Sequence, residues 1–449
     1  MWIIAAIVTV LLLAGASPPG RRLRTGASTL LMRVPRRTFL LSLVLTTGGL
    51  RLALLAAFTP PDTVDMREYV EKAKAIAADG HPREQESRPD GTRVYRALGY
   101  PLALAGWYAA TGWTGTSSAR CFNTVLAMLT AWLLVVTGER LRCPAEGRIA
   151  ALLMAIHLPH AIFSVIPYGE TWATLLLLGT LAALHTTSDA LSRARPGAGP
   201  AAIAGALLGL LLITRPEYLW LPAAIAMTGF LRHRGSGLKL LTPVSAGLLA
   251  LAIPFLVNHA MRVGYPGVLR ISVQGGLILY FGNNPLEVNG HGNGTPATRE
   301  RLAELSRGDP LRRRATAEAL GWMKANPLSV LANVPKKLHH LWLAKPEGFD
   351  WHVRAGQSGG LPLGLNRFLG AVGWLQWLLL FAAGLLGLFR FRDRFAPLIL
   401  LILAQSALFG LLSAVPRFHL PFEPVLALGT GLLVRPVSTT STRGRRRDR

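Results

Sequence analysis

The polar segment from Pro60 to Pro101 holds the first residues whose types and spacing suit chemistry. It follows a hydrophobic stretch and concentrates acidic residues in a chain that has few of them. Asp62, Asp65 and Tyr69 fall on one face of a helix that we predict over residues 62–78. A carboxylate fixed just outside a bilayer can act as a general base toward an acceptor hydroxyl. The competing interpretation makes Asp62 the N-cap and Asp65 a first-turn charge favoured by the helix dipole.

Charged residues also lie in short turns between hydrophobic stretches. Arg215 and Arg417 occupy turns on the predicted outer side, where the positive-inside rule disfavours cations, so they are candidate phosphate ligands. Glu170 begins a hydrophobic stretch and is a candidate substrate ligand. The alternative for Glu170 is a structural ion pair with Arg215 inside the membrane.

The late part of the chain contributes a further polar group. Asn283 and Asn284 lie in a glycine-rich piece, and Lys337 follows in an apolar and basic stretch. The asparagines suit substrate binding, but they are equally typical of turns. Lys337 suits a phosphate, but a lysine can also extend its amine to lipid headgroups.

The elements that carry these residues are transmembrane helices. The chain of 449 residues is 51% hydrophobic and only 16% charged, with a mean hydropathy of +0.37. Apolar runs long enough to cross a bilayer follow one another, which predicts an all-α, polytopic transmembrane bundle of about 10–11 spans. Residues 97–112 are apolar but short and glycine-rich, which favours a re-entrant or interfacial element.

The net charge of +25 does not indicate nucleic acid, because of where the charge lies. Arginines gather in residues 20–37, in the tail after residue 434 and in short connections between the apolar runs. That distribution marks cytoplasmic connections. The predicted divisions are a marginal N-terminal helix with a basic segment (1–37), a transmembrane core (38–258) that includes a first outer loop (59–96), a large outer loop (259–362), C-terminal transmembrane helices (363–434) and a basic tail (435–449).

Six short motifs follow one another in an order that resembles a known family. They are Asp65-x-x-x-Tyr69, Arg96-x-x-Gly99-Tyr100-Pro101, Pro167-Tyr168-Gly169-Glu170-Thr171, Thr214-Arg215-Pro216-Glu217, Tyr280-Phe281-Gly282-Asn283-Asn284-Pro285 and Arg417-Phe418-His419-Leu420-Pro421. Together they resemble GT-C glycosyltransferases that use polyprenyl-phosphate sugars, among them the protein O-mannosyltransferases and the lipid A aminoarabinose transferases. The resemblance spans about residues 60 to 425 and implies the GT-C fold.

The resemblance implies a role for each candidate residue. Asp65 is expected to be the catalytic base of an inverting transfer. The expected ligands of the donor phosphate are Arg417, Lys337, Arg215 and Arg96, and the expected substrate ligands are Tyr69, Glu170, Asn283 and Asn284. Family members often have two adjacent acids where this chain has Asp65 and Met66, so a divalent cation is in doubt.

The implied partners are a polyprenyl-phosphate sugar donor, membrane lipids and a hydroxyl acceptor in the cell envelope, without nucleic acid. The expected location is the cytoplasmic membrane, with several spans and the active site facing outside. An O-antigen ligase or polymerase is the rival enzyme, and it would place its key residues in the late outer loop. A lipid or solute transporter is the rival without catalysis, but the sequence has no repeat and its polar residues gather at one surface.

Overall fold

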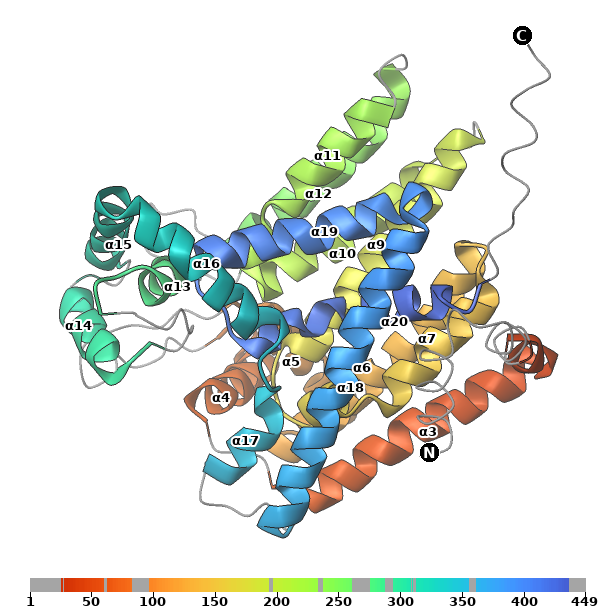
Figure 1. The fold of residues 1–449 in the computed structure, drawn as a ribbon, viewed down its shortest axis with the longest axis horizontal. Coiled ribbons are helices and arrows are strands. Elements are labelled where there is room, and N and C mark those ends of the chain that lie inside the picture. Colours follow the sequence, from red (N-terminus) through yellow and green to blue (C-terminus); the bar gives the residue numbers. More distant parts are fainter. Residues whose placement is uncertain are drawn as a thin grey trace.

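The computed structural model describes residues 26, 28–59, 63–82, 97–193, 197–232, 237–260, 275–286, 294–307, 309, 312–354 and 361–435. The predicted N-terminal helix, the basic tail after Arg435, Asp62 and Arg96 lie outside these residues. In the described part the regular elements are α-helices and two 3-10 helices, which confirms the all-α fold class (Figure 1).

The elements follow one another without interruption by a sheet. In order they are α3 (Arg36–Ala57), α4 (Val64–Asp79), α5 (Gly99–Thr111), α6 (Thr116–Arg140), α7 (Pro144–Ile156), α8 (Leu158–Ser164), α9 (Glu170–Ser192), α10 (Ala198–Thr214), η1 (Pro216–Tyr218), α11 (Leu221–Arg232), α12 (Gly237–Ala260), α13 (Gly275–Gly282), α14 (Pro296–Ser306), α15 (Arg313–Ala325), α16 (Pro327–Trp342), α17 (Glu347–Arg354), α18 (Leu363–Arg390), α19 (Arg392–Leu411), η2 (Pro416–Phe422) and α20 (Glu423–Leu432).

Five of the described helices are long and apolar enough to cross a membrane: α3, α6, α12, α18 and α19. A sixth crossing is possible where α7 and α8 form one apolar unit that bends by 61°. The chain is therefore a multi-pass membrane protein. Fewer helices pass this length test than the ten or eleven spans expected, because several predicted spans are shorter helices, such as α10 with 17 residues and α20 with 10.

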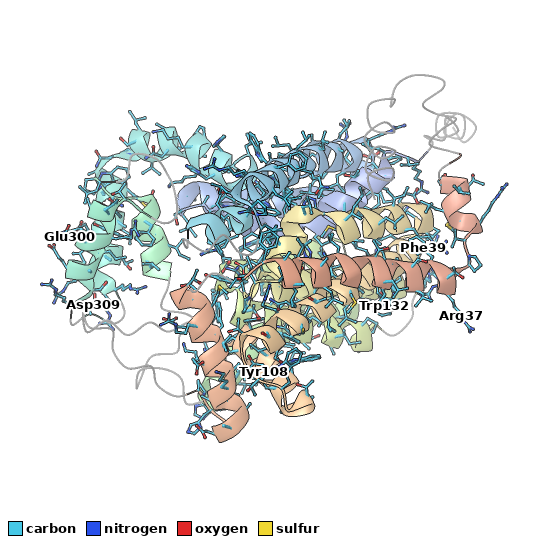
Figure 2. All side chains as sticks on the ribbon, turned by 90° about the horizontal axis from the view of Figure 1, so that it is seen from below. Arg37, Phe39, Tyr108, Trp132, Glu300 and Asp309 are labelled. Carbon is cyan, nitrogen blue, oxygen red and sulfur yellow. The ribbon has the colours of Figure 1, made fainter. Side chains whose placement is uncertain are left out.

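Basic helix ends gather at one end of the bundle. Arg36 at the start of α3 forms an ion pair with Glu139 at the end of α6, at 2.8 Å. Figure 2 shows Arg37 at this end and Glu300 of the late loop at the opposite end. We call this end of the bundle the basic end. Four arginines there contact residues of other segments: Arg36, Arg142, Arg394 and Arg435.

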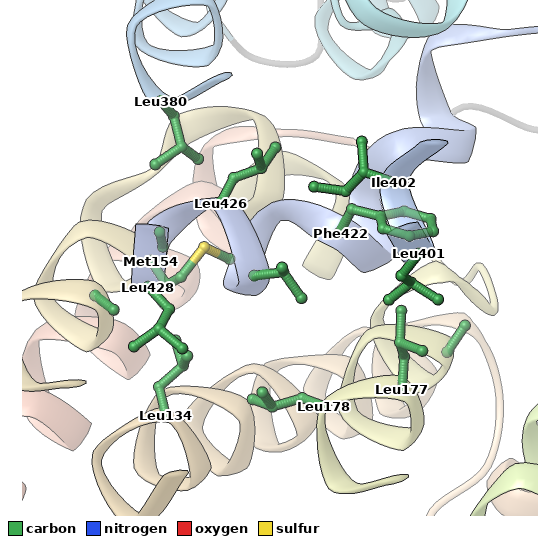
Figure 3. Packing of buried hydrophobic residues seen from close by; sticks show 14 of the residues in the cluster. Leu134, Met154, Leu177, Leu178, Leu380, Leu401, Ile402, Phe422, Leu426 and Leu428 are labelled. Carbon is green, nitrogen blue, oxygen red and sulfur yellow. The ribbon is translucent and has the colours of Figure 1, made fainter. Parts of the chain in front are cut away.

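The core lies between α6, α7, α9, α18, α19 and α20 (Figure 3). Leu134, Met154 and Leu426 are each at most 2% exposed there. Small residues let α18 and α20 approach closely, since a Cβ added to Gly387 would collide with the carbonyl oxygen of Gly429. This packing fixes the short helix α20, and with it the η2 segment that precedes α20.

Two predicted polar regions form helices close to the expected bounds. The helix predicted at 62–78 is α4, and its N-cap is Thr63, whose Oγ1 accepts a hydrogen bond from the backbone N–H of Met66. The expectation that Asp62 is the N-cap was therefore wrong by one residue. The predicted outer loop 259–362 contains the helices α14, α15 and α16. A small apolar cluster around Tyr280 and Leu302 packs α13 to α15 together.

Candidate active site

The candidate site lies at the end of the bundle opposite the basic end, where α4 begins. Asp65 occupies the first turn of α4 and is half-buried. Its neighbour Met66 turns inward and packs against Ile166 and Tyr168. The N-cap Thr63 places its hydroxyl 3.3 Å from the hydroxyl of Tyr168. The start of α4 is thus attached to the turn that precedes α9.

Polar residues of α6 hold that turn in place. Asn123 donates from Nδ2 to the carbonyl oxygens of Ile166, at 2.7 Å, and Tyr168, at 3.3 Å. Arg120 donates from Nε to the carbonyl oxygen of Val165 at 2.8 Å. These bonds reach carbonyl oxygens of a buried non-helical turn, of which that of Ile166 also accepts from the backbone N–H of Tyr168, at 2.7 Å. Arg120 and Asn123 were not among the residues selected from the sequence, although a charged residue within an apolar helix is a signal of function or structure.

Arg417 reaches the same place from the other end of the chain. It lies in η2, and its guanidinium carbon is 5.5 Å from the ring centroid of Tyr168 and 5.4 Å from that of Trp351. The two ring centroids are 5.3 Å apart, so the guanidinium lies beside a pair of contacting rings. A guanidinium beside aromatic rings is stabilised by cation–π attraction and loses little freedom when it binds an anion.

Glu170 lies between two arginines. Its carboxylate contacts Arg215 directly, and its Oε1 is 3.6 Å from Nε of Arg417. Arg215 also lies 3.4 Å from Glu217, and Arg417 lies 3.8 Å from Glu347. Glu170 is 2% exposed, which explains why it needs cationic partners. The ion pair of Glu170 with Arg215, considered from the sequence, is present.

The carboxylates keep Arg417 charged despite its burial. Burial opposes the charge, but Tyr168, Glu347, Glu170 and Asp65 together raise the pKa of the guanidinium above its ordinary value. Asp65 is thus an electrostatic neighbour of Arg417, although α4 and η2 are far apart in the sequence. A carboxylate and a buried guanidinium therefore stand at one end of an apolar bundle.

An aromatic wall completes this group. Tyr69 lies one turn after Asp65, and its ring packs edge-on against Tyr100, at 5.5 Å, and Tyr168, at 5.8 Å. Of the residues selected from the sequence, the structure brings together Asp65, Tyr69, Glu170, Arg215 and Arg417. Arg96 lies outside the described residues.

The late-loop candidates form a neighbouring group of their own. Lys337 is fully buried and donates from Nζ to Oδ1 of Asn283 at 3.0 Å and to the carbonyl oxygen of Leu411 at 3.4 Å. Asn283 also donates to the carbonyl oxygen of Leu411, at 2.8 Å. Asn284 is used within its own turn, where its Oδ1 accepts from the backbone N–H of Leu286. These contacts hold the link between α19 and η2, so this group supports the segment that carries Arg417.

The donor set around Asp65 does not fit a divalent cation. The residue beside Asp65 is the buried Met66, whose side chain packs against Ile166 and Tyr168. Across the described residues, no group of three His, Cys, Asp or Glu side chains could hold a metal ion. We therefore derive no chemical step through a metal.

No protein-family model matches the sequence, and a search of curated protein sequences gives no match. Among solved structures, the oligosaccharyltransferase of Archaeoglobus fulgidus, in complex with Zn and sulfate, is similar with a TM-score of 0.52 and 15% identity. The alignment covers 88% of this chain and 48% of that chain. The chain has the GT-C fold. It spans about half the length of that oligosaccharyltransferase.

Two further structures are similar at lower scores. ArnT from Cupriavidus metallidurans, bound to undecaprenyl phosphate, has a TM-score of 0.41 and 14% identity, over 89% of this chain and 78% of that chain. The A. fulgidus oligosaccharyltransferase AglB, in complex with an inhibitory peptide and a dolichol-phosphate, has a TM-score of 0.46 and 16% identity, over 89% of this chain and 50% of that chain.

Proposed function

We propose that this GT-C chain is a membrane glycosyltransferase that moves a sugar from a polyprenyl-phosphate carrier to a hydroxyl acceptor. The observation that carries the proposal is that the start of α4, which bears Asp65, is attached through Thr63 to Tyr168, whose ring centroid lies 5.5 Å from the guanidinium carbon of Arg417. Asp65 and Arg417 together suit a transfer in which one substrate loses a proton while the other releases a phosphate. The fold supports the proposal, because it is shared with an oligosaccharyltransferase.

The donor proposal rests on the two arginines and on the surrounding membrane. Arg417 and Arg215 converge on Glu170. A phosphate would supply the same negative charge with more acceptor oxygens, and arginine binds phosphate through paired hydrogen bonds. A donor with a polyprenyl tail would keep that tail in the bilayer beside the bundle. We infer that Arg417 is the main phosphate ligand and that Arg215 assists it.

The proposed chemical step transfers one proton, forms one bond and breaks another. The Asp65 carboxylate takes the proton of the acceptor hydroxyl as that oxygen bonds to the anomeric carbon of the donor sugar. The bond between that carbon and the phosphate oxygen breaks, and polyprenyl phosphate leaves with its charge stabilised by Arg417 and Arg215. A single displacement from the face opposite the phosphate inverts the anomeric centre.

The orientation proposal follows from the arginine distribution. The basic end lies on the cytoplasmic side of the cytoplasmic membrane under the positive-inside rule. The candidate site at the opposite end then faces outside. Its acceptor is accordingly a hydroxyl of a lipid, glycan or protein in the cell envelope.

The test is donor consumption by the purified full-length protein. Polyprenyl-phosphate sugars carrying a radiolabelled sugar are supplied one at a time, with a membrane extract as the source of acceptor. Release of polyprenyl phosphate together with label in a new product supports the proposal. An O-antigen ligase would instead require a diphosphate-linked glycan, and a transporter would move label across a vesicle membrane without breaking the sugar bond.

A further inference from the structure

A buried carboxylate lies beneath the candidate site and has no part in the proposed reaction. Glu423 begins α20 and is 0% exposed. Its Oε1 lies 3.4 Å from Nε2 of His157 and 3.5 Å from Nε2 of His419. Among the described residues neither carboxylate oxygen of Glu423 makes a hydrogen bond. We call His157, His419 and Glu423 the buried triad.

The triad joins two breaks in the helical bundle. His157 lies at the bend between α7 and α8, and His419 lies in η2. Each break leads into the candidate site, since α8 is followed by the turn of Tyr168 and η2 carries Arg417. His419 is two residues after Arg417, or roughly 4 Å along a 3-10 helix. A change in the position of His419 therefore moves Arg417.

The hydrogen-bond inventory of the triad requires a proton. Nδ1 of His419 lies 2.8 Å from the carbonyl oxygen of Leu341. A carbonyl oxygen only accepts, so Nδ1 carries a hydrogen, and a neutral His419 would present a lone pair at Nε2. An ionised Glu423 would face it with a second acceptor. Two buried acceptors that face each other are unfavourable, and one proton between them removes the conflict.

The surroundings do not supply that proton. The other charged or titratable groups that lie near Glu423 are Arg51 of α3 and His160 of α8. Arg51 donates to the carbonyl oxygens of Thr47 and Ala155 and lies 3.2 Å from Nδ1 of His160. A guanidinium only donates, so Nδ1 of His160 accepts, and His160 is neutral.

The face of His419 is covered by an aromatic ring. The ring of Trp377 lies parallel to that of His419, with their centroids 3.7 Å apart. Trp377 donates its indole N–H to the carbonyl oxygen of Trp342, at 2.7 Å, and so offers no acceptor to His419. The face of an indole ring favours a cation over a neutral ring, which suits a protonated His419.

We propose that the buried triad holds one proton beyond those of two neutral imidazoles, shared between Glu423 and His419, and that this proton keeps η2, and with it Arg417, in the position that binds the donor phosphate. His157, His419 and Glu423 are then positioning residues, because none of them touches the donor. The inference rests on the proposed function in that it takes a phosphate as the ligand of Arg417. Loss of the proton at high pH leaves facing acceptors, loosens η2 and weakens donor binding.

The experiment measures binding of undecaprenyl phosphate to the full-length protein in nanodiscs from pH 7.5 to 9.5. A phosphate monoester titrates near pH 6, so its own charge is constant across this range. For the parent we expect affinity to fall by about tenfold per pH unit once the proton dissociates. Glu423→Gln should bind as the parent does at pH 7.5 and show no fall, because its amide can donate to Nε2 without a proton.

Thr430→Val is the matched control. Thr430 lies on α20 and is also buried, but it bonds to the carbonyl oxygens of Leu380 and Leu426, outside the triad. The control should keep the pH profile of the parent. A flat profile in the parent, or the same slope in Glu423→Gln, would overturn the inference.

Two further measurements separate the possible failures. If Glu423→Gln does not fold, calorimetry of the parent at pH 8.5 in buffers of different ionisation enthalpy counts protons directly. Uptake of a proton on binding supports the triad, and no uptake overturns it. If the parent does not bind undecaprenyl phosphate at any pH, the proposed function fails. The triad is then tested separately by thermal stability, which the parent should lose above pH 7.5 and Glu423→Gln should not.

Discussion

Replacing Arg417 by alanine should weaken binding of the donor phosphate much more than binding of the acceptor. The guanidinium lies beside the rings of Tyr168 and Trp351, with Glu170 3.6 Å away, so it is already ordered for an anion. Charge-assisted contacts are worth about 1.5–3 kcal/mol, and about 1.4 kcal/mol is tenfold in affinity. The donor dissociation constant should therefore rise about 10- to 150-fold. The donor dissociation constant of Arg417→Lys should lie between those of the parent and Arg417→Ala, since lysine keeps the charge but lacks the planar stacking group.

The assay is equilibrium binding of labelled undecaprenyl phosphate to the purified protein in nanodiscs. Lys345→Ala is the control, because Lys345 is a cation on the connection to α17 whose ion pair with Asp350, at 2.8 Å, is partly exposed. This control should leave donor affinity within about twofold of the parent, because exposed pairs contribute little. Unchanged donor affinity in Arg417→Ala would refute the phosphate role. An equal loss of affinity in Arg417→Ala and Lys345→Ala would show only a general effect of positive charge.

Three further predictions concern topology, electrostatics and the turn before α9. A cysteine at Thr114 should react with an impermeant thiol reagent in intact cells and one at Ser192 should not, in a background where Cys121 is replaced; the reverse pattern would invert the orientation. Glu170→Gln should lower the melting temperature, because removing one partner of a buried pair costs about 3–5 kcal/mol, and donor phosphate should restore part of the loss; no ligand effect would contradict phosphate binding there. Asn123→Ala should cost about 1–3 kcal/mol in unfolding free energy, because it removes the amide that donates to the buried carbonyl oxygens of Ile166 and Tyr168; an unchanged melting temperature would show that the turn does not depend on these bonds.

Apolar runs predicted the long helices well, because length and hydropathy alone decide whether a segment can cross a bilayer. The runs that became α3 and α18 are examples, although each contains an arginine. A break near His157 is signalled by Pro159, because proline lacks a backbone N–H and its ring clashes with the carbonyl four residues earlier, but the angle of 61° could not be predicted. Contacts from distant elements help to set that angle, for example the hydrogen bond that the backbone N–H of Leu158 donates to Oε1 of Gln376 in α18.

Part of the candidate site could be predicted from the sequence. Glu170 and Arg215 interrupt apolar stretches, and isolated charges in such stretches need partners. The proximity of Asp65 to Arg417 depends on how α4 and η2 pack, which no local pattern encodes. The buried triad was missed because His157 and Glu423 lie inside apolar runs, and the sequence alone does not show that they face each other. Lys337 was chosen for its charge, whereas in the structure its amine donates to Oδ1 of Asn283 and to the carbonyl oxygen of Leu411 and so braces two segments of the chain.

The proposed mechanism depends most on the carboxylate of Asp65, and Asp65→Asn tests it most directly. Asparagine keeps the size of the side chain but cannot accept the acceptor proton. General-base catalysis contributes typically ~10²–10⁴-fold, so turnover should fall by at least that factor while donor affinity and melting temperature stay close to those of the parent. If Asp65 were only a first-turn charge, Asn would cost less than about 1 kcal/mol of stability and turnover would persist. The decisive measurement is therefore sugar transfer by Asp65→Asn beside Asp62→Asn: collapse in the first variant alone is the predicted result, and normal turnover in Asp65→Asn would contradict the account.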